Sequence, residues 1–377
     1  MLFLYFQAII SPLVLASFFL KKTDQRLIAI FLVGFYLLVF AMAFRFGVDW
    51  YEYEKSFENP GENYFEYGYV ALEKFFSFLG FNYYVFQFFV KCCFWISCLK
   101  LMSKYSTLNP FSIFLYFLLS TVFLNDVIRQ QLAAIFIFIA LIRLKKGCFQ
   151  FFFLVFLGSI FHKSAFFVLP FYFLYQSKKV ENIFILLALI AFCFSFLNFS
   201  IVGFFINSAT ALLGDDLGER IVFYHQLTGS EMTLGRFLRF LLLILFVWNI
   251  KLNKKILLDE NQRVVFIAVM MMLGYEMIFY DVMPIWARVR EYFVVLFPAL
   301  FFICFNNRLQ KNAARLFVLV YAGYTFLGIS IANSALFETY SSYNNFIYCE
   351  VFGCESYSDK KERDVESYWL SYWMENR

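Results

Sequence analysis

Charged residues are scarce in this chain of 377 residues: Asp, Glu, Lys and Arg make up 16% of it, and it has only two histidines. Soluble globular domains carry about 25% charged residues, so this composition excludes the ordinary soluble classes. The sequence also has no glycine-rich nucleotide-binding loop, no nucleic-acid-binding signature and no cofactor motif. We therefore expect no cofactor and no nucleic-acid partner. No repeat of fixed period is evident, which argues against the paired halves of many transporters.

Apolar residues make up 62% of the chain, with 58 phenylalanines among them. A bilayer core needs about 20 apolar residues per helix, and the chain supplies candidate spans almost from end to end. The composition predicts an all-α, polytopic integral membrane protein with about twelve transmembrane helices, some of them short and broken. The candidate spans are residues 2–20, 27–44, 82–99, 110–124, 128–142, 149–161, 165–177, 182–206, 236–250, 264–280, 285–305 and 316–336.

The distribution of basic residues predicts the orientation of these spans. Lys and Arg in short loops stay in the cytoplasm, and basic clusters follow alternate spans of this chain. The first apolar run has its charges after it, the reverse of a cleavable signal peptide, so we interpret it as a span. Both termini then face outward from one transmembrane domain, residues 1–336. The same side carries the loops 45–81 and 207–235 and a tail, 337–377. The basic clusters lie at 21–26, 100–104, 143–146, 178–179, 251–263 and 308–315.

Two polar breaks interrupt the apolar sequence between residues 121 and 170. The first runs from Asn125 to Gln131, and the second is His162 with Lys163. A charge at the membrane centre costs about 2.5–3.5 kcal/mol on insertion scales, so such residues indicate a functional site. The segments 149–161 and 165–177 are each too short to cross alone. One fused span would place the basic clusters at 143–146 and 178–179 on opposite sides. We therefore expect two short helices near the outer leaflet, and one pocket shared by both breaks.

Six short motifs occur in order: RFGVDWYEY at 45–53, EYGYVAL at 66–72, NDVIRQQLA at 125–133, FHKSAFFVLP at 161–170, ARVREYF at 287–293 and YSSY at 340–343. In these motifs the chain resembles the EpsG-type O-antigen and exopolysaccharide polymerases, the Wzy class. The resemblance implies a metal-independent glycosyltransferase of the bacterial inner membrane, with a C-type glycosyltransferase fold. It would join undecaprenyl-pyrophosphate-linked oligosaccharide units at the periplasmic face. It also implies membrane lipid and a chain-length regulator as partners. The tail after Tyr343 lies outside the resemblance.

Arginines are the candidates for binding the diphosphate that leaves in such a reaction, because a guanidinium fork contacts two phosphate oxygens at once. Arg129 begins the span 128–142, where free backbone N–H groups also favour an anion. Its structural alternative is a pair with Asp126. Arg288 belongs to a motif, Arg290 is a weaker candidate and Arg45 ends a span; for all three the alternative is an arginine that reaches to the membrane interface.

His162 and Asp49 compete for the role of the base that accepts the proton of the acceptor hydroxyl. Histidine titrates near neutral pH, but Lys163 beside it would depress its basicity, and it could simply bond a carbonyl. Asp49 lies beside Trp50 and Tyr53, which suit sugar stacking; its alternative is a helix cap. The catalytic candidates are thus His162, Asp49, Arg129 and Arg288, and the substrate-binding candidates are Arg45, Lys163, Arg290, Glu66, Tyr53, Tyr292, Tyr340 and Tyr343.

Other features leave alternatives open. Lys91 and Glu276 within spans either line the cavity or pair with polar groups. The acids at 215–219 lack nearby histidine, which favours a solvated loop over a metal site. Cys349 and Cys354, on the oxidising side, suit a small disulfide. A lipid-oligosaccharide flippase or transporter is the alternative function from another class. An O-antigen ligase is a third, and it differs from the polymerase only in its acceptor.

Overall fold

The computed structural model describes residues 2–61, 65–105, 108–196, 234–252, 259–279, 283–304, 343–374 and a few isolated positions between 312 and 327. Within these ranges the regular structure is helical, apart from one bridge between Ala43 and Asn345, and the predicted all-α class is confirmed. The chain divides into two compact units, residues 1–166 with 316–375, and residues 167–315. The predicted boundary between membrane domain and tail, at 336, lies outside the described residues.

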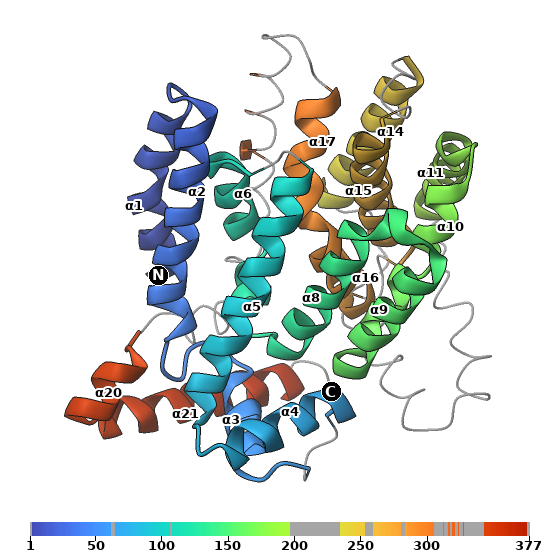
Figure 1. Ribbon diagram of the computed structural model, residues 1–377. Helices are drawn as coiled ribbons and strands as arrows, with labels where there is room; N and C mark the ends of the chain where they lie inside the picture. The colour runs from blue at the N-terminus through green and yellow to red at the C-terminus, as the bar shows by residue number, and fades with distance from the viewer. Residues whose placement is uncertain are drawn as a thin grey trace. The chain divides into compact units, whose positions relative to one another are not determined.

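The first unit is built around three packed helices of the chain's first half. Helix α8 packs against α5 on one side and α9 on the other, and α6 packs against α1 and α2 (Figure 1). Side chains of Asn82 and Asn109 cap α5 and α6, accepting hydrogen bonds at 3.0 and 2.9 Å. Its helices are α1 (Leu2–Ser17), α2 (Lys22–Tyr36), α3 (Trp50–Glu58), α4 (Tyr67–Phe78), α5 (Tyr83–Lys104), α6 (Pro110–Leu119), α7 (Thr121–Asn125), α8 (Ile128–Ile142), α9 (Cys148–Phe161), α20 (Phe346–Phe352) and α21 (Glu355–Met374).

An aromatic cluster joins four helices of this unit. Tyr53 of α3, Tyr69 of α4, Phe86 of α5 and Ile128 of α8 are all buried in it. Each large apolar side chain contributes about 1.5–3 kcal/mol by leaving water, so the cluster fixes α3 and α4 against the start of α8. Helices α20 and α21 lie with α3 and α4 at the end of α5 that begins at Tyr83 (Figure 1).

The second unit is arranged around α15. Residues 264–274 of this helix are all buried, and the helix packs against α10, α11, α14, α16 and α17. The carboxylate of Asp259 caps its first turn at 2.9 Å from the amide of Gln262. The helices are α10 (Pro170–Gln176), α11 (Val180–Phe196), α14 (Leu234–Leu252), α15 (Glu260–Ile278), α16 (Met283–Phe293) and α17 (Phe297–Cys304).

The predicted spans agree with these helices unevenly. Helix α8 begins and ends where predicted, but 110–124 and 285–305 are not continuous helices: the first breaks at Ser120, and the second at a 3-10 turn, Val294–Leu296. Pro298 explains the second break, because a proline inside a helix clashes with the carbonyl four residues earlier. In the described part of the chain, Lys22–Ala41 and Tyr83–Lys104 are long and apolar enough to cross a membrane. The number twelve stays a prediction, and most of 316–336 lies outside the described residues.

Candidate functional site

The first polar break lies where predicted, between the end of α7 at Asn125 and the start of α8 at Ile128. Polar side chains bond the carbonyls that end α7: the Tyr36 hydroxyl donates to Leu124 O at 2.8 Å, and Gln131 Nε2 donates to the same oxygen at 3.0 Å. Lys91 Nζ donates to Asn125 O at 3.1 Å. Lys91 therefore pairs with polar groups, one of the two roles that the sequence left open for it. Together these hydrogen bonds satisfy the carbonyl groups at the end of α7 and stabilise the break.

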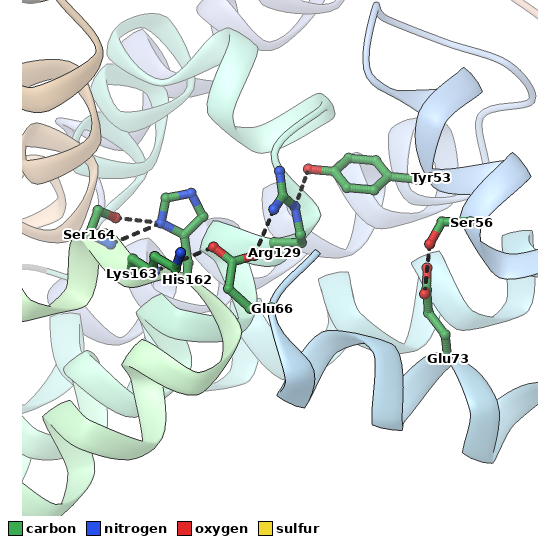
Figure 2. Close-up of polar contacts among 8 residues, drawn as sticks. All are labelled: Tyr53, Ser56, Glu66, Glu73, Arg129, His162, Lys163 and Ser164. Carbon is green, nitrogen blue, oxygen red and sulfur yellow. Dashed lines mark hydrogen bonds and ion pairs between the residues drawn. The ribbon is translucent and has the colours of Figure 1, made fainter. Parts of the chain in front are cut away.

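Arg129, in the first turn of α8, lies at the centre of a cluster drawn from distant parts of the chain. Its Nη1 is 2.6 Å from Glu66 Oε2, and its Nε is 3.5 Å from the Tyr53 hydroxyl. The guanidinium carbon lies 4.1 Å from the centre of the Phe65 ring. Figure 2 shows Tyr53 and Glu66 approaching Arg129 from different sides. The side chains of Arg129 and Glu66 are 22% and 13% exposed, so the pair is only partly enclosed.

The ion-pair partner that the structure gives Arg129 is Glu66, whereas Asp126, the partner suggested by spacing, bonds the turn before α3. Oδ1 of Asp126 accepts from the Val48 amide at 3.1 Å. The contact requires Gly47, which has a φ of +98°, since a Cβ there would lie 1.7 Å from the same oxygen. Asp49 follows at the N-cap position of α3, yet its side chain makes no capping hydrogen bond. The Asp126 carboxylate thus fixes the turn that carries Asp49.

His162 forms the second break, with extended backbone between α9 and the 3-10 turn Lys163–Val168. The prediction of two helices rather than one fused span is confirmed. The ring is buried; its Nδ1 lies 2.6 Å from Ser164 Oγ and accepts from the Ser164 amide at 3.2 Å. Because a backbone N–H can only donate, the lone pair at Nδ1 is engaged, and a neutral ring carries its proton at Nε2.

The two breaks meet at Glu66. One carboxylate oxygen binds Arg129, and the other lies 3.5 Å from the backbone nitrogen of Lys163 (Figure 2). The Lys163 side chain is exposed beside it. Glu66 therefore links the start of α8 to the residue after His162, as expected for a shared site. The shared pocket and its opening toward the outer side stay predictions.

Arg45 and Tyr343 bond other parts of the first unit. Arg45 forms ion pairs with Glu54 at 3.1 Å and with Glu362 of α21 at 2.8 Å. The Tyr343 hydroxyl donates to Val39 O at 2.6 Å. Arg45 is thus held between carboxylates of two helices, and its place relative to the membrane interface stays a prediction.

The remaining candidates belong to the second unit or lie outside the described residues. Arg288 is exposed on α16, Arg290 pairs with Glu291 at 2.6 Å, and Tyr292 is fully buried. Glu276 pairs with Arg239 at 3.2 Å, so it too has a polar partner. The gathering of Arg288 with Arg129 and His162 stays a prediction. Residues outside the described ranges are Tyr340 and the acids Asp215, Asp216 and Glu219.

Glu73 of α4 is a buried carboxyl group that the sequence reasoning missed. It is fully buried and accepts from the Ser56 hydroxyl at 2.9 Å, set apart from the Arg129 cluster in Figure 2. Burial raises the pKa of Glu73 to about 7, although hydrogen bonds from Ser56 and Tyr69 oppose the shift. Its spacing in the sequence could have revealed this burial. Glu73 lies four residues after Tyr69 and three before Phe76, which places all three on the apolar face of the helix.

The Arg129 cluster can bind an anion, and its aromatic rings can contact a sugar face. Burial raises the pKa of Tyr53 to about 12, so this side chain stays a neutral phenol that can donate or accept. In the described ranges, no group of three or more His, Cys, Asp or Glu side chains is placed to hold a metal ion. Cys349 and Cys354 form a disulfide, in agreement with the sequence.

Comparison of the sequence with known protein families gives a match. The sequence model of the EpsG family matches residues 28–345. The match includes Arg45, Asp49, Glu66, Arg129 and His162, and it ends before α20 begins. No curated protein and no solved structure gives a significant match.

Proposed function

The chain belongs to the EpsG family, which is linked to exopolysaccharide biosynthesis, and from this premise we propose that it is a repeat-unit polymerase. The family and the apolar helices indicate a membrane protein. In the proposed reaction, oligosaccharide units carried on undecaprenyl pyrophosphate are joined at the periplasmic face of the inner membrane. The growing chain on its lipid diphosphate is the donor, and a new lipid-linked unit is the acceptor.

The observation that carries the proposal is the placement of Arg129. It is a partly exposed cation in the first turn of a fifteen-residue helix, between an aromatic ring and a carboxylate. Unpaired backbone N–H groups and the helix dipole favour an anion at such an end. Glu66 binds Nη1 and holds the guanidinium in one orientation. The N–H groups of Arg129 that do not bond Glu66 can donate to phosphate oxygens. A diphosphate is the anion that this arrangement fits best.

The chemistry assigns a task to each group. The acceptor hydroxyl oxygen attacks the anomeric carbon of the donor, and the bond from that carbon to the phosphate oxygen breaks. The diphosphate leaves with the electron pair, and Arg129 stabilises its developing charge. A preorganised donor of this kind is worth about 3–4 kcal/mol in the transition state. Arg288 keeps its role as the second cation in this proposal.

The proton of the acceptor hydroxyl needs a base, and the geometry favours Asp49 over His162 for that task. The Nδ1 atom of His162 already accepts from the Ser164 amide. A neutral ring is then a donor at Nε2, which suits it to a phosphate or sugar oxygen. The Asp49 carboxylate makes no capping bond to its own helix and lies next to Trp50, whose ring can support a sugar.

Deletion of the gene, followed by complementation with variants, tests the proposal. We expect deletion to leave surface lipid capped with single repeat units, and Arg129→Lys to behave like the deletion, because an ammonium cannot reproduce the bidentate fork. The matched control is Arg143→Lys, an exposed position at the other end of α8, which should restore full polymer. Polysaccharide separated by gel shows the result. Complete loss of surface repeat units would favour a flippase or ligase, and normal polymer from Arg129→Lys would remove Arg129 from the site.

A further inference from the structure

The C-terminal tail adds backbone pairing to the segment that precedes the predicted site loop. The Phe44 amide donates to Asn344 O at 2.9 Å, and the Phe346 amide donates to Met42 O at 2.9 Å. The rings of Tyr84 and Phe346 stack with centroids 4.8 Å apart. The tail is therefore fastened beside residues 42–44, directly before the turn that leads to Asp49.

Helix α21 then holds Arg45, the only described non-glycine residue with a positive φ, at +46°. That conformation is unfavourable for an L-residue and persists only where surrounding contacts maintain it. The contacts here include ion pairs with Glu362 at 2.8 Å and with Glu54 at 3.1 Å, a hydrogen bond to Ser358 and a cation–π contact with Trp50 at 4.9 Å. Glu362 and Ser358 belong to α21.

The residue next to Glu362 turns inward. Lys361 is fully buried, with its Nζ 5.8 Å from the ring centres of both Phe46 and Tyr357. Burial lowers the pKa of Lys361 to about 8, while the carboxylates of Asp364 and Asp126 oppose the shift. The Lys361 ammonium lies beside the ring of Phe46, the residue before Gly47. A buried cation needs such partners to be stable.

We propose that α21 positions the site loop: the buried Lys361 ammonium lies beside the Phe46 ring, directly before the turn that the Asp126 carboxylate holds through the Val48 amide, and Glu362 holds Arg45, so that Asp49 is fixed at the start of α3. Lys361 and Glu362 act through other groups and are positioning residues. The inference rests on the proposed function, in which Asp49 is the favoured base. It extends the site beyond residue 345, where the family match ends.

The test compares Lys361→Met, which removes the charge, with Lys361→Arg, which keeps it. The matched control is Lys360→Met, since Lys360 is the exposed neighbour on the same helix. Elongation of lipid-diphosphate-linked repeat units is measured with the full chain in liposomes. We expect Lys361→Met to lower kcat by about tenfold or more through misplacement of the base. KM should stay within about twofold, because substrate contacts are unchanged. Lys361→Arg and Lys360→Met should resemble wild type.

Hydrogen exchange of the amides at 46–50 gives a second readout that needs no substrate. Lys361→Met should exchange faster there than wild type, and Lys360→Met should not. If wild type makes no polymer, the proposed function fails, while unchanged exchange in Lys361→Met would independently overturn the positioning role. Where wild type polymerises, an unchanged kcat in Lys361→Met overturns the proposal.

Glu362→Gln covers the case in which Lys361→Met does not fold. The Glu362 side chain is 42% exposed, so the fold should tolerate the change. Glu362→Gln weakens the pair with Arg45, so it should lower kcat and speed the hydrogen exchange of amides 46–50. Both effects should be smaller than those of Lys361→Met. A kcat and an exchange rate equal to those of wild type would contradict the role of α21.

Discussion

Glu73 in the first unit and Glu276 in the second are carboxyl groups with almost no exposure, 0% and 1%, but with different partners. Glu276 faces the guanidinium of Arg239 at 3.2 Å. Glu73 accepts from the neutral hydroxyl of Ser56 at 2.9 Å. Burial disfavours the ionised form of Glu73 and raises its pKa to about 7, and the hydrogen bond from Ser56 offsets only part of that shift. The second unit thus encloses a charge pair, and the first encloses a carboxyl group that titrates.

The Arg129–Glu66 pair differs from both. Its two side chains are 22% and 13% exposed, so a ligand can approach without the loss of a fully enclosed pair. Removal of one member of an enclosed pair leaves a buried charge and destabilises the fold. Loss of Arg129 should mainly affect ligand binding and chemistry. Enclosure thus separates charges that stabilise the fold from those that can act on a substrate.

The largest expected effect on stability comes from Arg239→Ala. It leaves the buried Glu276 carboxylate without its cation, which should cost about 3–5 kcal/mol of unfolding free energy. Denaturant unfolding of the solubilised protein measures it, and Lys178→Ala, an exposed change in the same unit, is the control. If Arg239→Ala had the same free energy of unfolding as Lys178→Ala, the enclosed pair would not stabilise the fold, and the proposed difference between enclosed and partly exposed pairs would be wrong.

Glu73→Gln tests the other side of the comparison through pH. Because the folded pKa of Glu73 is about 7 and the ordinary value is 4.5, the folded state holds a proton that the unfolded state releases between these values. Wild-type stability should therefore fall as pH rises through this window, and the Gln variant should lack that part of the loss. Thermal unfolding at several pH values measures the difference.

Glu58→Gln, an exposed carboxyl group at the end of α3, is the matched control for the pH experiment. It should follow the wild-type curve. Parallel curves for wild type and Glu73→Gln between pH 4.5 and about 7 would mean that Glu73 is ionised throughout. Burial would then not hold this carboxyl group in its neutral form.

Ser56→Ala should have the smallest effect and sharpens the comparison. Loss of one buried hydrogen bond costs about 1 kcal/mol. Since the Ser56 hydroxyl lowers the pKa of Glu73, its removal should also move the pH-dependent loss of stability to higher pH. The same unfolding measurements report both changes, with the exposed Ser77→Ala of α4 as control. A shift toward lower pH would contradict the assigned hydrogen bond.

The sequence predicted the two breaks because polar residues inside apolar helices must find partners, and that requirement is local. Asn125 to Arg129 and His162 therefore marked the helix ends correctly. The partner of Arg129 was not predictable in this way. Spacing along the chain suggested Asp126, but the structure brings in Glu66, 63 residues away, through the packing of α4 on α9.

The tail shows a second limit of sequence reasoning. The part after Tyr343 lies outside the motifs, and its tyrosines and acids gave no site prediction. The pairing of Glu362 with Arg45, 317 residues earlier, depends on the positive φ of Arg45 and on burial of Lys361. Neither has a signature in composition or periodicity. Glu73, by contrast, had a signal in its spacing from Tyr69 and Phe76, although a single acid in an amphipathic helix is usually solvated.

The most direct test of the central claim is polymerisation by the purified protein in liposomes supplied with lipid-diphosphate-linked repeat units. Wild type and Arg143→Lys should both convert single units into a series of longer chains, while Arg129→Lys, folded to the same extent, should leave the units unjoined. Equal chain formation by wild type and Arg129→Lys would contradict the claim that the cation at the start of α8 stabilises the leaving diphosphate.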